Sequence, residues 1–429
     1  MFKQIFFSKT RVLILLLFLV SFFHFNYIPE IIRMSYDKKM FYAIVIFLTL
    51  GFIGKPNKKN TIFDRIIKIT FVSILICAIA NCISCFIFRH QPLWVTFFHW
   101  SPIFLLYLYY PFRTLNFSVK TWESILFTLF CIEMVVEIIQ NLFPDALLFQ
   151  MTSGNVKFLF ERRVRVYGCS ILYIGQLFVL NKGLINRNGS WRYWLLYITS
   201  FCLMILSGFR IVLFASVVSS CIMVLRIKKM EIRTTIVIII SVLCLYGVTQ
   251  TIFFQSHLSE IVERQENTSF YDNDNVRMVT LEYYLNNYFV NPYEWLFGSG
   301  MVKRIVDSGA GPDDIVKTNL YESKYSRDVS MTSARYHIYP VDWGLLGLSW
   351  EAGVPAILIL IVLQFYLMFH KLDNKYLYIS SWGLFALIIS AFGGSYYSSP
   401  NLLYTAILLV IFNEVSRDNF GIMDSKKNM

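Results

Sequence analysis

Long apolar runs and short polar segments alternate along the whole chain. The runs are unbroken rather than alternating residue by residue, so they indicate helices and not the strands of a membrane barrel. A helix that crosses a membrane needs about 20 apolar residues. The pattern therefore predicts an all-α polytopic membrane protein with about twelve spanning helices. These lie at residues 12–28, 40–54, 66–88, 93–111, 122–143, 166–181, 193–207, 210–226, 234–253, 343–369, 377–392 and 400–415.

One polar segment is much longer than the others and covers residues 254–342. It has a helical stretch at Val276–Tyr288 and glycine turns at Gly298-Ser-Gly300 and Gly309–Pro312. The segment is too short and too interrupted for a typical independent enzyme domain. We expect it to be an extracytoplasmic loop that caps a site formed by the helices. The chain then divides into nine helices in residues 1–253, the loop in 254–342, and three helices with a tail in 343–429.

The composition agrees with a membrane protein. Hydrophobic residues make up 56% of the 429 positions, charged residues only 15%, and the mean hydropathy is +0.55. Soluble domains are near one quarter charged, which disfavours an ordinary soluble enzyme. The formal net charge of +12 does not indicate a nucleic-acid partner, because the Lys and Arg residues form short clusters between apolar runs.

The distribution of Lys and Arg predicts the orientation. With the N-terminus inside, 22 of the 39 fall in cytoplasmic segments or helix ends, nine in short outer loops and eight in the long loop. Cytoplasmic loops are enriched in these residues, so we expect both termini in the cytoplasm. The long loop has 13 acidic residues against its eight basic ones and is net negative.

Cysteine, histidine and acidic residues do not form a recognisable metal motif. The eight cysteines lie inside or at the edge of apolar runs, without a CxxC pair or a Cys/His cluster, so disulfides and structural zinc are not expected. Asp272-Asn-Asp274 matches the short DxD motif that binds metal-nucleotides in some glycosyltransferases, but it lies on the predicted outer side, where a solvated loop is the simpler interpretation. We predict no metal and no cofactor.

Several basic residues contradict the positive-inside pattern. Lys157, Arg162, Arg163 and Arg165 precede the helix at 166–181, and Arg210 sits in a tight turn between two helices. Arginine suits a bidentate grip on phosphate oxygens, so a diphosphate clamp at the outer surface is one interpretation. Contact with lipid headgroups is the other, and we favour it for Arg162 and Arg163.

Two further groups of ionisable residues are candidates. Glu133 and Glu137 lie four residues apart on one face of a predicted span. Intramembrane carboxylates serve either in a structural ion pair or in a proton relay. His337 and Asp342 close the long loop. A histidine there suits general-base chemistry, although a loop histidine is often simply solvated.

Four stretches, in order, resemble the O-antigen ligase and polymerase family of bacterial envelope enzymes. They are Arg165-Val-Tyr-Gly168; Ser207-Gly-Phe-Arg210 continuing to Ala215; Asn275-Val-Arg277 followed by Asn291-Pro292 and Leu296-Phe-Gly298-Ser-Gly300; and His337 through Asp342-Trp-Gly344 to Glu351-Ala-Gly353-Val354. The resemblance covers about residues 160–365. The sequence departs from the family at Phe209, where a second serine is usual, and in the 14-residue spacing between His337 and Glu351.

The resemblance implies a GT-C-like, inverting, metal-independent glycosyltransferase acting on glycans linked to undecaprenyl diphosphate. Arg165 and Arg210 would bind the diphosphate, Arg277 would join them or orient the loop, and His337 or Asp342 would be the base. Glu133 and Glu137 would be intramembrane support. Membrane lipid, a chain-length regulator and a flippase are the partners expected besides the lipid-linked glycans.

Three functions stay open on the sequence. A polymerase of lipid-linked repeat units, making O-antigen, capsule or exopolysaccharide, is favoured. A ligase that transfers glycan to lipid A-core or protein shares the same chemistry and differs in its acceptor. A polysaccharide flippase or transporter agrees with twelve helices and with Glu133 and Glu137, but the chain has no two-fold repeat.

Overall fold

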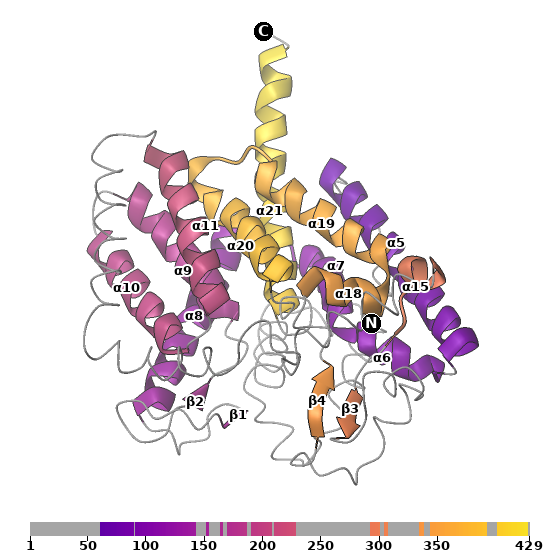
Figure 1. The fold of residues 1–429 in the computed structure, drawn as a ribbon. Coiled ribbons are helices and arrows are strands. Elements are labelled where there is room, and N and C mark those ends of the chain that lie inside the picture. Colours follow the sequence, from indigo (N-terminus) through magenta and orange to yellow (C-terminus); the bar gives the residue numbers. More distant parts are fainter. Residues whose placement is uncertain are drawn as a thin grey trace, which may run out of the picture.

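The computed structural model describes twelve stretches of the chain. They are residues 61–89, 91–142, 152–153, 164–165, 170–186, 190–207, 210–228, 292–300, 304–307, 334–338, 344–392 and 401–427. These residues are mainly helical, as the hydrophobic pattern predicts (Figure 1). The predicted helices at 12–28, 40–54 and 234–253 lie outside the described residues, as do Val276–Tyr288 and Gly309–Pro312.

The long apolar runs within the described residues form helices close to the predicted bounds. They are α5 (Ile62–Arg89), α6 (Leu93–Phe104), η1 (Leu105–Leu108), α7 (Tyr109–Thr114), α8 (Val119–Leu142), α9 (Ser170–Ile185), α10 (Ser190–Ser207), α11 (Arg210–Lys228) and α20 (Leu377–Phe392). The helix predicted at 400–415 forms α21 (Asn401–Lys427), which continues beyond the predicted end. A short 3₁₀ turn, η5 (Asn374–Tyr376), lies between the predicted helices. The predicted helix 93–111 thus contains a 3₁₀ stretch, η1, between two α-helical parts.

The predicted helix 343–369 is wrong in one respect, because it is interrupted. It forms α18 (Gly344–Ala352) and α19 (Val354–Phe369), which are separated at Gly353. Pro355 explains the interruption. A proline has no N–H to donate to the carbonyl four residues earlier, here that of Glu351, and its ring collides with that carbonyl in a continuous helix.

Two short antiparallel strand pairs accompany the helices, and the all-helical prediction misses them. In the first, β1 (Thr152–Ser153) pairs with β2 (Val164–Arg165). In the second, β3 (Arg304–Asp307) pairs with β4 (Ala334–Ile338). A short helix, α15 (Pro292–Phe297), precedes β3. These strands are too short for a two-residue periodicity to be recognised in the sequence.

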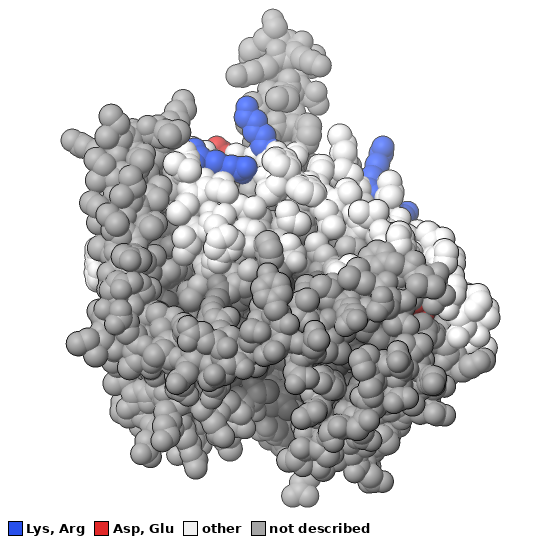
Figure 2. Space-filling model, in the orientation of Figure 1, with Lys and Arg blue, Asp and Glu red and all other residues white. Residues whose placement is uncertain are grey.

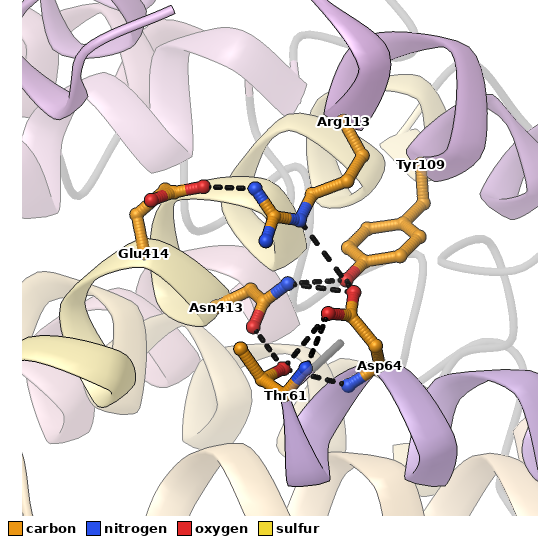
Figure 3. A network of polar contacts seen from close by, with 6 residues as sticks. All are labelled: Thr61, Asp64, Tyr109, Arg113, Asn413 and Glu414. Atoms are coloured by element: carbon orange, nitrogen blue, oxygen red, sulfur yellow. Dashed lines mark hydrogen bonds and ion pairs between the residues drawn. The ribbon is translucent and has the colours of Figure 1, made fainter. Parts of the chain in front are cut away.

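One end of the helical body is tied together by a charged cluster of Thr61, Asp64, Tyr109, Arg113, Asn413 and Glu414 (Figure 3). Arg113 on α7 lies between Asp64 on α5, at 3.5 Å, and Glu414 on α21. Asn413 donates to the same Asp64 oxygen, Oδ1, at 2.8 Å. The cluster therefore joins α5, α7 and α21, which are remote in sequence.

Thr61 and Asp64 also cap the start of α5. The Asp64 backbone N–H donates to the Thr61 hydroxyl at 3.0 Å, and the Thr61 N–H donates back to Asp64 Oδ2 at 2.8 Å. This is the reciprocal arrangement of a capping box, which satisfies amide groups that have no partner within the helix.

Three further contacts bring other helix ends to the same side. Lys182 at the end of α9 forms an ion pair with Glu123 on α8 at 2.9 Å. The Asn181 amide donates to the carbonyl of Asn374 in η5, and Arg226 on α11 donates to the carbonyl of Met368 on α19. All of these ends belong to segments that the charge count assigns to the cytoplasmic side. In the view of Figure 2, the described Lys and Arg side chains gather near the end from which α21 projects.

Candidate functional site

The helix interruption at Gly353 leaves backbone carbonyls at the end of α18 that need donors. In a continuous helix Glu351 would bond to residue 355, which is a proline. In the structure the Gly300 N–H donates to the Glu351 carbonyl at 3.0 Å, and the Ser299 N–H donates to the Trp350 carbonyl at 2.7 Å. The Ser299 hydroxyl adds a second bond to Trp350, at 3.0 Å.

These donors come from the long loop. Residues 292–300, comprising α15 and the turn Gly298-Ser-Gly300, dock on α5 and on the α18–α19 break; we name this contact the glycine junction. Tyr293 on α15 stacks on Phe88 of α5, with ring centroids 4.4 Å apart. Glu294 and Glu351 are both buried there. The predicted turn at Gly298-Ser-Gly300 is confirmed, and it is attached to the helices rather than free.

Two glycines make the approach possible. Gly298 has φ +74° and Gly353 has φ +86°, a region that L side chains rarely adopt. A Cβ on Gly298 would lie 2.5 Å from the Glu351 carbonyl oxygen, and one on Gly353 would lie 2.5 Å from the Leu296 carbonyl oxygen. Both obstacles are backbone atoms, so a side chain at either position forces the two segments apart.

Asn81 of α5 completes the junction and is fully buried. Its side-chain amide donates to the carbonyls of Phe297 and, at 3.1 Å, Glu351. Its side-chain oxygen accepts a hydrogen bond from Trp100 Nε1 of α6 at 2.8 Å. The hydrogen bonds of this one asparagine thus join α5, α6, α15 and α18, and both its amide nitrogen and its oxygen have partners.

The predicted phosphate-binding and base residues are carried by segments at the same end as the glycine junction. Arg165 lies in β2 opposite Thr152, Arg210 is the first residue of α11, and His337 lies in β4 opposite Ile305. The helices that follow these segments run to the charged-cluster end, so the segments themselves lie at the opposite end (Figure 1). For Arg165, Arg210 and His337 the structure describes the backbone only.

Arg277 and Asp342 lie outside the described residues, as do Asp272 and Asp274. Within the described part of the chain, no group of three His, Cys, Asp or Glu side chains is arranged to hold a metal ion.

Glu133 and Glu137 on α8 point into the protein. They are 1% and 2% exposed, whereas Ile132, Val135 and Ile139 of the same helix are 39–55% exposed. The predicted shared face is therefore the buried face of α8, and the aliphatic side chains form its outer face.

The sequence prediction missed Asn81 and the contact between the two glycine motifs. The signal for Asn81 was present, because it is an amide inside the apolar run Ala78-Ile-Ala-Asn81-Cys82. A buried amide in such a run needs partners. The partners themselves were not predictable, because Phe297 and Glu351 are more than 200 residues away.

Comparison with protein-family models and with curated proteins finds no match to this chain.

Proposed function

We propose that the chain is a polytopic membrane glycosyltransferase that polymerises undecaprenyl-diphosphate-linked oligosaccharide repeats at the outer face of a bacterial cytoplasmic membrane. The observation that supports this most is the glycine junction. It joins Gly298-Ser-Gly300 and Glu351-Ala-Gly353, which belong to two of the four stretches that resemble the O-antigen polymerase and ligase family. Two motifs that meet backbone to backbone are better explained by a common site than by chance similarity.

Exposed apolar faces support the membrane part of the proposal. α5 alone is long and apolar enough, at Ile62–Phe88, to cross a membrane among the described helices. Shorter apolar helices accompany it at Ile171–Ile185, Ile211–Ile227, Val354–Phe369 and Leu402–Ser416. On α5 and α19, which pack together, large apolar side chains face outward. They include Ile69, Ile76, Ile83, Phe86, Leu358, Val362 and Phe369. This many large exposed apolar side chains on two packed helices is unusual for a soluble protein.

The end of α10 that follows α9 carries side chains typical of a membrane boundary. Trp191 and Trp194 are both exposed, and the Arg192 guanidinium lies 5.7 Å from the centre of the Trp191 ring. Tryptophan is enriched at the membrane–water boundary. This boundary would coincide with the charged-cluster end, where Lys182 lies in the last turn of α9.

The proposed reaction transfers a glycan from its lipid diphosphate to a sugar hydroxyl. Arg165 and Arg210, with Arg277, would stabilise the negative charge that develops on the leaving diphosphate. His337 or Asp342 would take the proton of the attacking hydroxyl. Buried Glu133 and Glu137 would support the helices. The reaction as proposed uses no metal and no cofactor.

The experiment that tests this function is deletion of the gene, followed by electrophoresis of the cell's surface glycans. A polymerase leaves glycans of a single repeat unit. Long chains that remain on undecaprenyl diphosphate would instead indicate a ligase, and lipid-linked units retained inside the cell would indicate a flippase. Either of these two results contradicts polymerisation.

The arginine assignment is tested by complementing the deletion strain with Arg210→Lys and Arg165→Lys. Lysine keeps the charge and loses the bidentate fork, so we expect most long-chain product to disappear while the protein still reaches the membrane. Arg163→Ala is the matched control and should retain long chains. Normal chains with Arg210→Ala would contradict the diphosphate clamp.

A further inference from the structure

The glycine junction attaches the long loop to the helical body at an internal point. The predicted loop, residues 254–342, would otherwise be connected only at its two ends. Docking of residues 292–300 divides it into two parts, and the second, residues 301–342, lies in sequence between the junction and the start of α18. Ordering a shorter closed loop costs less conformational entropy than ordering a longer one.

The β3–β4 pair continues from this attachment. β3 begins at Arg304, soon after Gly300, and β4 ends at Ile338, shortly before α18 begins at Gly344. Arg304 pairs with Ile338, so the two strand ends nearest the helical body are opposite each other, and the next pair is Ile305 with His337. His337 is therefore in the second residue pair of the β3–β4 ladder, counted from the strand ends nearest the glycine junction.

We propose that Asn81 and the glycine junction are a positioning device that anchors the long loop and sets the place of His337 above the helix ends. Asn81 is the residue on which this depends, since its amide bonds to a carbonyl on each of the two docked segments, Phe297 and Glu351. The anchoring itself is independent of the proposed glycosyltransferase activity. The importance of His337 rests on that activity.

The anchoring is tested by thiol labelling. Ser299 is 1% exposed in the junction, so a Ser299→Cys variant of the otherwise native chain should react slowly, as measured by peptide mass spectrometry at that position. Adding Asn81→Asp places a carboxylate against two carbonyl oxygens and removes two donors. We expect labelling at position 299 to rise by about tenfold or more at pH 8.

A pH series separates repulsion at the junction from a general loss of structure. A buried aspartic acid titrates above its ordinary range, and its protonated form can again donate to one carbonyl. Because the reactive thiolate fraction of any cysteine falls with pH, labelling in the Asn81→Asp protein is compared with that in Asn81→Leu at each pH, and the ratio should fall as the pH is lowered from 8 to 5. Asn81→Leu, which cannot donate at any pH, should stay open throughout. A pH response that is the same in both variants overturns the proposal.

Asn181→Asp is the matched control, because Asn181 also donates its amide to a backbone carbonyl, that of Asn374, but at the opposite end of the body. It should leave labelling at position 299 unchanged. Equal labelling in the Asn181→Asp and Asn81→Asp proteins, or unchanged labelling in the latter, would show that Asn81 does not hold the loop.

The consequence for His337 is read in the same variants from the surface glycans. Chains shortened by Asn81→Asp, with normal membrane levels and normal chains in Asn181→Asp, support positioning. If labelling at position 299 rises but the surface glycans keep their normal length, the link to His337 is overturned, while the anchoring of the loop by Asn81 is still supported. If deletion of the whole gene leaves the glycans unaltered, the proposed function fails, and the labelling result stands separately.

Discussion

The two ends of the helical body are held together by different chemistry. At one end charged side chains make the contacts, with Arg113 between Asp64 and Glu414. At the other end the glycine junction uses backbone N–H and carbonyl groups, with Asn81 as an uncharged bridge. The charged cluster joins three helices that come from different parts of the chain, and the glycine junction joins a loop segment to a broken helix.

This difference predicts different sensitivities. The charged cluster depends on the ionisation of its members and on each of them being present, because a buried charge without its partner is costly. The glycine junction contains few atoms that a side-chain substitution can remove. It is sensitive instead to the addition of atoms, since a Cβ on either Gly298 or Gly353 would lie 2.5 Å from a backbone carbonyl oxygen.

The largest expected contrast concerns the compartments that the two ends face. In a cysteine-free background, Lys228→Cys lies at the end of α11 near the charged cluster, and Ser308→Cys follows β3. We expect a membrane-impermeant thiol reagent added to intact cells to label position 308 and to reach position 228 only after permeabilisation. Labelling of position 308 only after permeabilisation would reverse the orientation and contradict the outer location of the site.

Removing the central cation of the charged cluster should cause the largest loss of stability. Arg113→Met leaves Asp64 and Glu414 with an uncompensated negative charge in a largely buried site, where the Arg113 side chain is 7% exposed. Breaking such a pair costs about 3 kcal/mol or more. The measurement is thermal unfolding of the purified protein in detergent.

The control for Arg113→Met is an exposed ion pair at the same end. Lys375 lies 3.5 Å from Asp373, and both side chains are more than half exposed. Lys375→Met should change the free energy of unfolding by less than about 0.5 kcal/mol. Equal effects of the two substitutions would show that the cluster is not a buried network.

The corresponding test of the glycine junction adds a single methyl group. Gly353→Ala forces an L side chain into a φ of +86°, which by itself costs about 1–3 kcal/mol. We expect the Ser299→Cys site to become reactive while the helical content measured by circular dichroism is retained. Gly183→Ala within α9 is the control, because a Cβ there would lie 3.4 Å from the nearest atom, Tyr193 Cβ, which is an ordinary contact, and the helical backbone has no positive φ. A Gly353→Ala protein that protects position 299 would contradict the described contact.

The sequence predicts the helices well and their contacts poorly. The bounds of α20 agree with the prediction of 377–392 because a continuous apolar run is bounded by polar residues on both sides. The break at Gly353 was missed because apolar residues continue through it, although Gly353-Val-Pro355 carried the signal. Hydrophobicity reports burial in protein or lipid, and it does not report where a backbone hydrogen bond is lost.

The candidate site shows the same division. The resemblance placed Gly298-Ser-Gly300 and Glu351-Ala-Gly353 among four stretches of one family, but it did not predict that they contact each other. The roles of Arg165, Arg210, Arg277, His337 and Asp342 stay predictions. The charged cluster was not predicted, because Asp64, Arg113 and Glu414 are linked by no local spacing. Contacts between residues this distant depend on how helices pack, which one sequence does not specify.

The smallest expected effect is a pH response at the charged-cluster end. His370, immediately after α19, packs its ring against Phe412 and Tyr366, with centroids 5.0 and 5.3 Å away. Burial lowers the pKa of His370 below its ordinary value of 6.5, so the fold favours the neutral imidazole.

His370 in the unfolded chain binds a proton near pH 6.5, whereas His370 in the folded protein does so only at a lower pH. The contribution of His370 to stability should therefore be constant above that pH and should decrease as the pH falls through 6.5 towards the lower pKa of the folded state. His370→Phe keeps an aromatic ring and cannot titrate, so its unfolding temperature should decline less between pH 7 and pH 5. An identical decline in both proteins would show that other groups at this end, and not His370, respond to acid.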